Sequence, residues 1–225
     1  MTRQIPLPLP HREAMEANDY VITASNKEAA AWVEAWPNWS SHCLLVLGPS
    51  GSGKTHLLNL WLQKTGGNPI AAKDLATADA GDLLAAGNII AVDNVDEVAG
   101  LTEAETCLLH LYNALKENKG SLLLTASVPP AQWKPGLADW RSRLLASPVA
   151  SIGEPDDELM NMLLIKQFHD RQISVSADVV SYLLPRIERS SLAVRQLVDT
   201  LDRAALAENR AVTIALARKC LEKTP

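Results

Sequence analysis

One run of eight residues has the types and spacing to bind a polyphosphate. Residues 48–55 have the pattern G-x-x-x-x-G-K-[ST]. They follow the apolar run of residues 43–47 and precede a helix-type apolar pattern over residues 57–62. Glycines let backbone N–H groups turn toward phosphate oxygens, and a helix start adds its positive dipole end. Lys54 would reach the outer phosphates, and the Thr55 hydroxyl would bind Mg²⁺. With the neighbouring His56, the expected nucleotide contacts are Gly48, Pro49, Ser50, Gly51, Ser52, Gly53, Lys54, Thr55 and His56.

An apolar strand that ends in a carboxylate supplies a second element. Residues 89–92 are apolar and Asp93 follows them, which is the pattern that holds Mg²⁺ through water in phosphate-loop proteins. Alone, this pattern is more often a strand that ends at a solvated turn, but the upstream loop favours the metal site. The next residue is Asn94, which can hydrogen-bond a water but cannot accept its proton. Asp96 and Glu97 lie nearby in the sequence, but the pattern does not determine where their side chains point. Nucleotide binding is therefore expected, whereas hydrolysis of the nucleotide by this chain itself is in doubt.

Composition narrows the class of protein. The 225 residues carry a net charge of −5, which excludes the broad basic field of a stand-alone nucleic-acid binder. The three cysteines, Cys43, Cys107 and Cys220, lack metal-type spacing and suggest reduced thiols in a cytoplasm. We find neither a signal-peptide pattern nor an apolar run that could span a bilayer, so a soluble cytoplasmic protein is expected.

The pattern along the chain predicts three parts: an extended arm over 1–12, an α/β domain over 13–153 and an all-helical subdomain over 154–225. Alternating strands and helices in the second part predict a parallel sheet with helices on both faces. Strands are expected at 43–47, 69–72, 89–92, 121–125 and 148–152. In the second part, helices are expected at 26–36, from Lys54 onward, and at 102–117, where Thr102 and Glu105 would form a capping box. In the third part, helices are expected at 156–171, 176–186, 190–208 and 213–223. The N-caps of the last three would be Ser176, Ser190 or Ser191, and Thr213.

The N-terminal arm alternates prolines with apolar residues, which excludes a helix and favours an extended conformation. Such a pre-extended segment suits a groove on a partner, although a disordered leader is equally compatible with this composition.

Several motifs together resemble one family. They are Gly53–Leu58, Ile90–Val95, Leu122–Pro130, Trp140–Leu144 and Leu192–Leu197. These segments are similar to the AAA+ region of the bacterial initiator DnaA, over nearly the whole chain from about residue 20 to residue 221. The chain stops where an initiator would continue into its basic DNA-binding domain. It therefore resembles the DnaA-related AAA+ regulatory proteins of the Hda family.

The resemblance implies roles for individual residues. Arg143 matches the arginine finger that enters a neighbouring subunit's nucleotide site, and Arg195 matches the sensor-2 arginine. Ser127 occupies the sensor-1 position, where the family more often has Asp. Tyr20 and Val21 would line the base and ribose pocket. ADP or ATP with Mg²⁺ is the implied cofactor.

The resemblance also implies partners. Gln4, Ile5, Leu7 and Leu9 match a peptide that binds the DNA polymerase III sliding clamp (beta subunit). Docked there, the chain would promote hydrolysis of DnaA-bound ATP, with neither sequence-specific DNA contact of its own nor membrane attachment, and self-association as a homodimer is a further option. Two alternatives stay open: a self-sufficient ATPase, such as a helicase loader or remodelling subunit, and an adaptor in which nucleotide only orders the fold.

Overall fold

Five parallel strands form one sheet in the order β2-β3-β4-β1-β5. They are β1 (Cys43–Leu47), β2 (Asn68–Ala71), β3 (Ile89–Asp93), β4 (Ser121–Ala126) and β5 (Val149–Ser151). Continuous apolar runs suit this arrangement, because the strands of a parallel sheet are covered on both faces. The expected parallel sheet is confirmed, and each strand end differs from the prediction by at most one residue.

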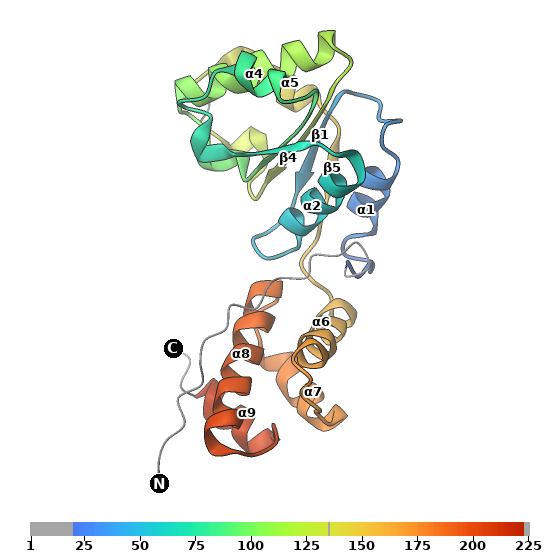
Figure 1. Ribbon diagram of the computed structural model, residues 1–225, viewed down its shortest axis with the longest axis vertical. Helices are drawn as coiled ribbons and strands as arrows, with labels where there is room; N and C mark the ends of the chain where they lie inside the picture. Colours follow the sequence, from blue (N-terminus) through green and yellow to red (C-terminus); the bar gives the residue numbers. More distant parts are fainter. Residues whose placement is uncertain (1–19, 135, 223–225) are drawn as a thin grey trace. The chain divides into compact units, whose positions relative to one another are not determined.

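The computed structural model describes residues 20–134 and 136–222 (Figure 1). The chain divides between Gly153 and Glu154 into two compact units, which we call the N-terminal and C-terminal units. Within the described ranges, no helix has both the length and the apolar character needed to cross a membrane.

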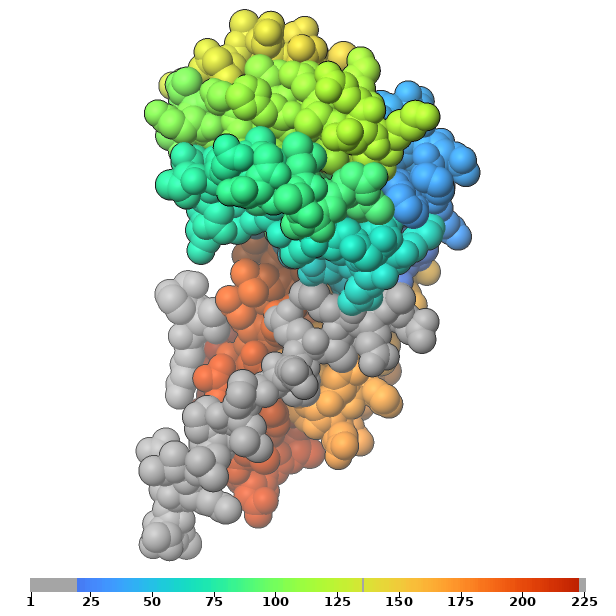
Figure 2. Space-filling model, turned by 45° about the horizontal axis from the view of Figure 1, so that its top comes forward, coloured from blue at the N-terminus to red at the C-terminus, as the bar shows by residue number. Residues whose placement is uncertain are grey.

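Helices cover both faces of the sheet in the N-terminal unit (Figure 1). One face carries α1 (Lys27–Glu34) and α2 (Lys54–Thr65), and the other carries α3 (Ala80–Ala85), α4 (Thr102–Glu117) and α5 (Ala138–Ala146). Along β1 the side chains alternate between the faces: Leu44 packs with Trp61 of α2, and Leu45 packs with Leu108 of α4. In Figure 2 the green segments that include α3 and α4, which pack against each other, lie on the surface of the N-terminal unit.

The start of α4 differs from the predicted capping box. Thr102 is the first helical residue, and Leu101 occupies the N-cap position without a side-chain hydrogen bond. Glu105 is only 1% exposed; its Oε1 accepts the Gly100 N–H at 2.7 Å and its Oε2 accepts the Leu137 N–H at 2.7 Å. The predicted capping box is therefore wrong, because the carboxylate joins the loop before α4 to the residue that precedes α5.

Four α-helices build the C-terminal unit around its own apolar core. They are α6 (Asp157–Asp170), α7 (Ala177–Leu183), α8 (Ser191–Glu208) and α9 (Ile214–Leu221). Ser190 and Thr213 cap α8 and α9 with side-chain hydrogen bonds, whereas Ser176 before α7 makes no such bond. The helix expected over 176–186 ends early at Leu183 and continues as a 3-10 turn that contains Pro185.

Replacing Glu105 with Ala should destabilise the N-terminal unit by about 2–4 kcal/mol, because two backbone N–H groups lose a charged acceptor in a buried site. All six tryptophans lie in this unit, so urea unfolding followed by tryptophan fluorescence measures it selectively. Glu103→Ala, an exposed change two residues earlier in the same helix, should stay within about 0.5 kcal/mol of the wild type. Equal stability of the two variants would contradict the role assigned to Glu105.

Candidate functional site

The loop between β1 and α2 has the backbone geometry of a phosphate-binding loop. Gly51 and Gly53 have φ angles of 74° and 101°, which side-chain-bearing residues rarely adopt. Gly48 is needed for a different reason, since an added Cβ would lie 2.7 Å from the Ile152 carbonyl oxygen and 2.9 Å from Ser52 Oγ. The loop runs directly into the N-terminus of α2, whose free N–H groups favour an anion.

Lys54 lies at the centre of this loop. Its side chain is 5% exposed, and its ammonium group donates to Gly48 O at 2.9 Å, to Pro49 O at 3.0 Å and to Ser127 Oγ at 3.0 Å. Burial lowers the pKa of Lys54, and the negative charges of Asp96 and Asp93 oppose that shift. Ser127, expected from the resemblance at the sensor-1 position, therefore lies in direct contact with the loop lysine.

Asp93 stands at the end of β3 between two threonine hydroxyls. Thr55 Oγ1 donates to Asp93 Oδ2 at 2.8 Å, and Thr125 Oγ1 donates to Asp93 Oδ1 at 2.5 Å. Thr125 also accepts the Asn94 N–H at 2.8 Å, while Asn94 has the left-handed angles φ 53° and ψ 51°. These hydrogen bonds join the ends of β3 and β4 to the start of α2.

The structure adds two residues that sequence reasoning did not assign. Thr125 is fully buried and links Asp93 to Asn94, and Asp96 Oδ2 accepts the N–H groups of Ser127 at 2.9 Å and Val128 at 3.0 Å. An apolar run marks where a strand ends but not which residues lie beside that end, so the contacts of Thr125 with Asp93 and of Asp96 with Ser127 follow only from the sheet order.

The segment before α1 reaches the start of α2. The Tyr20 ring packs edge-on against the His56 ring with centroids 5.2 Å apart, and its Cε2 is 3.7 Å from the position of a Cβ on Gly53. Burial raises the pKa of Tyr20 to about 12. The Val21 carbonyl accepts the Asn26 side-chain amide at 2.8 Å. Tyr20 thus lies beside the loop, and the base-pocket role that the resemblance implies for Tyr20 and Val21 stays a prediction.

The donor set at this site fits Mg²⁺. A hydroxyl and a carboxylate oxygen lie 2.8 Å apart in Thr55 and Asp93, and oxygen ligands suit this ion, which keeps several waters. The described residues contain no group of three or more His, Cys, Asp or Glu side chains that could form a cage around a metal. A magnesium ion here would depend on phosphate and water oxygens for the rest of its ligands.

Arg143 lies on α5, across the sheet from α2. Its guanidinium carbon is 6.0 Å from the centroid of the Tyr112 ring, and its Nε is buried with no hydrogen-bond partner among the residues that the structure describes. Tyr112 packs edge-on against Trp140 of the same helix α5. The neighbouring Arg141 donates from Nη2 to the Ala131 carbonyl at 3.2 Å. The Arg143 guanidinium group thus lies near the Tyr112 ring, where α4 and α5 pack against each other.

The remaining predicted residues belong to other parts of the chain. Arg195 lies in α8 of the C-terminal unit and is partly exposed. Gln4, Ile5, Leu7 and Leu9 lie outside the described residues. Their assigned roles remain predictions.

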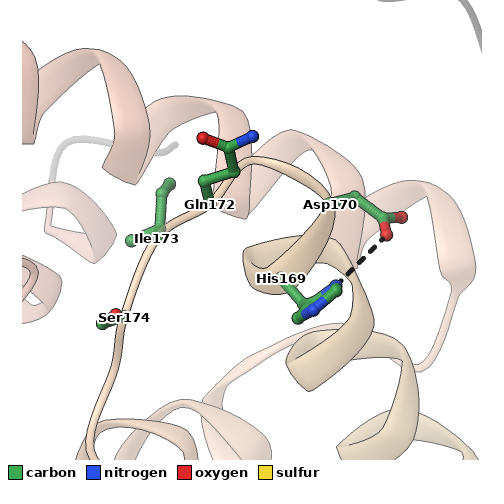
Figure 3. A pocket seen from close by; sticks show the side chains of 5 residues that line it. All are labelled: His169, Asp170, Gln172, Ile173 and Ser174. Carbon is green, nitrogen blue, oxygen red and sulfur yellow. Dashed lines mark ion pairs between the residues drawn. The ribbon is translucent and has the colours of Figure 1, made fainter.

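A shallow pocket in the C-terminal unit lies at the turn after α6 (Figure 3). It is lined by His169, Asp170, Gln172, Ile173 and Ser174. The imidazole of His169 is 4.0 Å from the carboxylate of Asp170 and is mostly exposed, so the pocket lacks the buried polar groups of a built binding site.

The sheet order and the phosphate loop define an AAA+ P-loop protein, and solved structures share this fold. Domain III of the replication initiation protein DnaA from Thermotoga maritima is similar with a TM-score of 0.81 and 18% identity, over 96% of this chain and 100% of that one. AMPPCP-bound DnaA from Aquifex aeolicus has a TM-score of 0.73 and 18% identity, over 88% and 69% of the two chains. The RuvB Holliday junction branch migration motor of Thermotoga maritima has a TM-score of 0.67 and 14% identity, over 87% and 66%.

Sequence comparisons add one match to a family model and one to a relative. Residues 156–221 match the family model described as "Hda, lid domain". An uncharacterized protein of Haemophilus influenzae is 26% identical over 184 residues, which cover 78% of this chain and 80% of that protein. The C-terminal unit is thus similar to the lid domain of Hda proteins, and the chain shares the fold of DnaA domain III.

Replacing Thr125 with Val should lower the free energy of unfolding of the N-terminal unit by about 2–3 kcal/mol, because the Asp93 carboxylate and the Asn94 N–H lose a buried hydroxyl partner. Thr125→Ser keeps the hydroxyl and should cost about 1 kcal/mol for the lost methyl group. Tryptophan fluorescence during urea unfolding measures both. A valine variant as stable as the serine variant would show that the hydroxyl is dispensable.

Proposed function

We propose that this protein is a nucleotide-binding regulator of replication initiation that promotes hydrolysis of ATP bound to DnaA. The observation that carries the proposal is a built phosphate site that has Asn94, rather than a carboxylate, directly after Asp93. An amide orients water but cannot take its proton, so the site suits binding better than turnover. The nucleotide bound to this protein would then control its regulatory activity rather than be hydrolysed.

The ligand of this site is ADP or ATP. The AMPPCP-bound DnaA structure, which shares the fold, supports an adenine nucleotide. The P-loop N–H groups and Lys54 would hold the phosphates, with Tyr20 and Val21 on the base side; the resemblance assigns the sensor-2 role to Arg195. Mg²⁺, held by Thr55 directly and by Asp93 through water, would neutralise phosphate charge.

Action on a partner would depend on Arg143. A guanidinium group that enters another subunit's site offsets the charge that develops on the transferred phosphoryl group. Similarity to DnaA in fold and to Hda proteins in the lid supports DnaA as the partner.

Delivery to DNA would depend on the N-terminal arm. Its pattern Gln4, Ile5, Leu7, Leu9 suits a groove on the sliding clamp, and alternating prolines keep such a peptide extended before it binds. An acidic chain that lacks a basic field would then reach DNA through its partners.

Replacing Lys54 with Ala should weaken ADP and ATP binding by roughly a hundredfold, since the charged donor to the phosphates is lost. Isothermal titration calorimetry with Mg²⁺ measures this directly. Lys64→Ala, which removes the same charge from an exposed position of the same helix, should bind like the wild type. If nucleotide affinity is unchanged in Lys54→Ala, the phosphate site is not where we place it. Lost binding with full regulatory activity would favour the adaptor alternative.

Replacing Arg143 with Ala should lower clamp-dependent hydrolysis of DnaA-bound ATP by roughly two orders of magnitude or more, while binding of ADP by the variant itself stays unchanged. The assay combines purified protein, DNA-loaded clamp and ATP-bound DnaA, and it follows ADP formation. Arg141→Ala, which removes the same charge two residues earlier, serves as the matched control. Undiminished hydrolysis with Arg143→Ala would rule out this mechanism.

Two controls belong to the same assay. A chain without residues 1–10 should lose clamp binding and keep nucleotide affinity, so retained clamp binding would refute the role of the arm. The protein alone with ATP should release little ADP; rapid turnover without DnaA would favour the self-sufficient ATPase instead.

A further inference from the structure

The two carboxylates near the end of β3 have different partners. Asp93 accepts the hydroxyls of Thr55 and Thr125. Asp96, in the 3-10 turn Val95–Val98 that follows, accepts two backbone N–H groups through a single oxygen. The first carboxylate therefore faces the start of α2, and the second fixes the chain just beyond β4.

Two side chains bind the backbone of the segment beyond β4: Trp133 Nε1 donates to the Val128 carbonyl oxygen at 2.7 Å, and Asp96 accepts the N–H groups of Ser127 and Val128. Ser127 and Val128 follow the last residue of the strand, and the Val128 side chain is 40% exposed, so apolar burial contributes little there. Without Asp96, both N–H groups would lose the acceptor that sets the direction of this backbone.

The position of the Ser127 backbone determines where the Ser127 side-chain hydroxyl lies. Ser127 Oγ accepts a hydrogen bond from the Lys54 ammonium at 3.0 Å, at the centre of the phosphate loop. Asp96 also acts on Lys54 at longer range, since its charge favours the protonated amine against the effect of burial. The second Asp96 oxygen, Oδ1, is buried and has no hydrogen-bond partner within the described residues.

We infer that Asp96 is a positioning residue of the nucleotide site: by binding the N–H groups of Ser127 and Val128, it holds the Ser127 hydroxyl against Lys54 and so sets nucleotide affinity. The inference rests on the proposed nucleotide site and adds a residue to it. The carboxylate that the family more often has at position 127 is thus supplied from the neighbouring strand end, and it acts through the backbone.

A double-mutant cycle tests the inference, because two residues that act through one contact give non-additive effects. Affinity for ADP and ATP with Mg²⁺ is measured for Asp96→Ala, Ser127→Ala and the double variant. Each single change should weaken binding about fivefold, and the double variant also about fivefold rather than about twenty-fivefold. Asp96→Asn, which keeps an oxygen for both N–H groups, should stay within about twofold of the wild type. Exposed Glu97→Ala is the matched control and should leave affinity unchanged.

Each outcome decides the matter. Additive effects near twenty-fivefold, or an Asp96→Asn variant as weak as Asp96→Ala, would overturn the inference. Tryptophan fluorescence verifies that the variants fold; if Asp96→Ala does not, Asp96→Ser, whose shorter side chain withdraws the acceptor, replaces it in the cycle. If Lys54→Ala binds nucleotide like the wild type, the proposed nucleotide site itself is refuted. If Lys54→Ala loses nucleotide binding but the effects of Asp96→Ala and Ser127→Ala are additive, only the role of Asp96 is refuted.

Discussion

The buried ammonium group of Lys54 is the constraint on which the site depends. A charge that is 5% exposed must be surrounded by acceptors, and here they come from two loop carbonyls and one serine hydroxyl. Meeting that requirement fixes the curvature of the loop and the position of Ser127. Because carboxylates at the end of β3 supply the compensating charge, the third strand is also part of the same electrostatic unit.

The parallel register explains why these groups meet. Leu47 pairs with Ala126 and Val92 pairs with Leu124, so the carboxyl ends of β1, β3 and β4 lie at one edge of the sheet. Residues that follow those strands are then neighbours, although 30 or more positions separate them in sequence. The chemistry of the site follows from this topology, while the two apolar layers that hold the sheet contribute no polar group to it.

Sequence patterns predicted the parts of the fold that depend on local rules. Unbroken apolar runs located the central strands β1, β3 and β4, which are covered on both faces, and shorter runs located the partly exposed edge strands β2 and β5. The six-residue helix α3 was missed because fewer than two turns show no clear period. Glu105 was misassigned because a capping box and a long-range acceptor have the same sequence spacing, and only the position of Leu137 separates them. Thr125 received no role and the direction of Asp96 was left open for the same reason: their partners lie on a neighbouring strand or just beyond it.

The backbone at Asn94 bears on how easily such a site changes its chemistry. Its left-handed angles are tolerated by both Asn and Asp, whose short polar side chains are the usual exceptions among L-residues. The codons of these two amino acids differ by a single base. Gain or loss of an acidic group beside the nucleotide therefore requires no rebuilding of the loop. One substitution at this position therefore changes whether the side chain after Asp93 can accept a proton, while the backbone keeps its conformation.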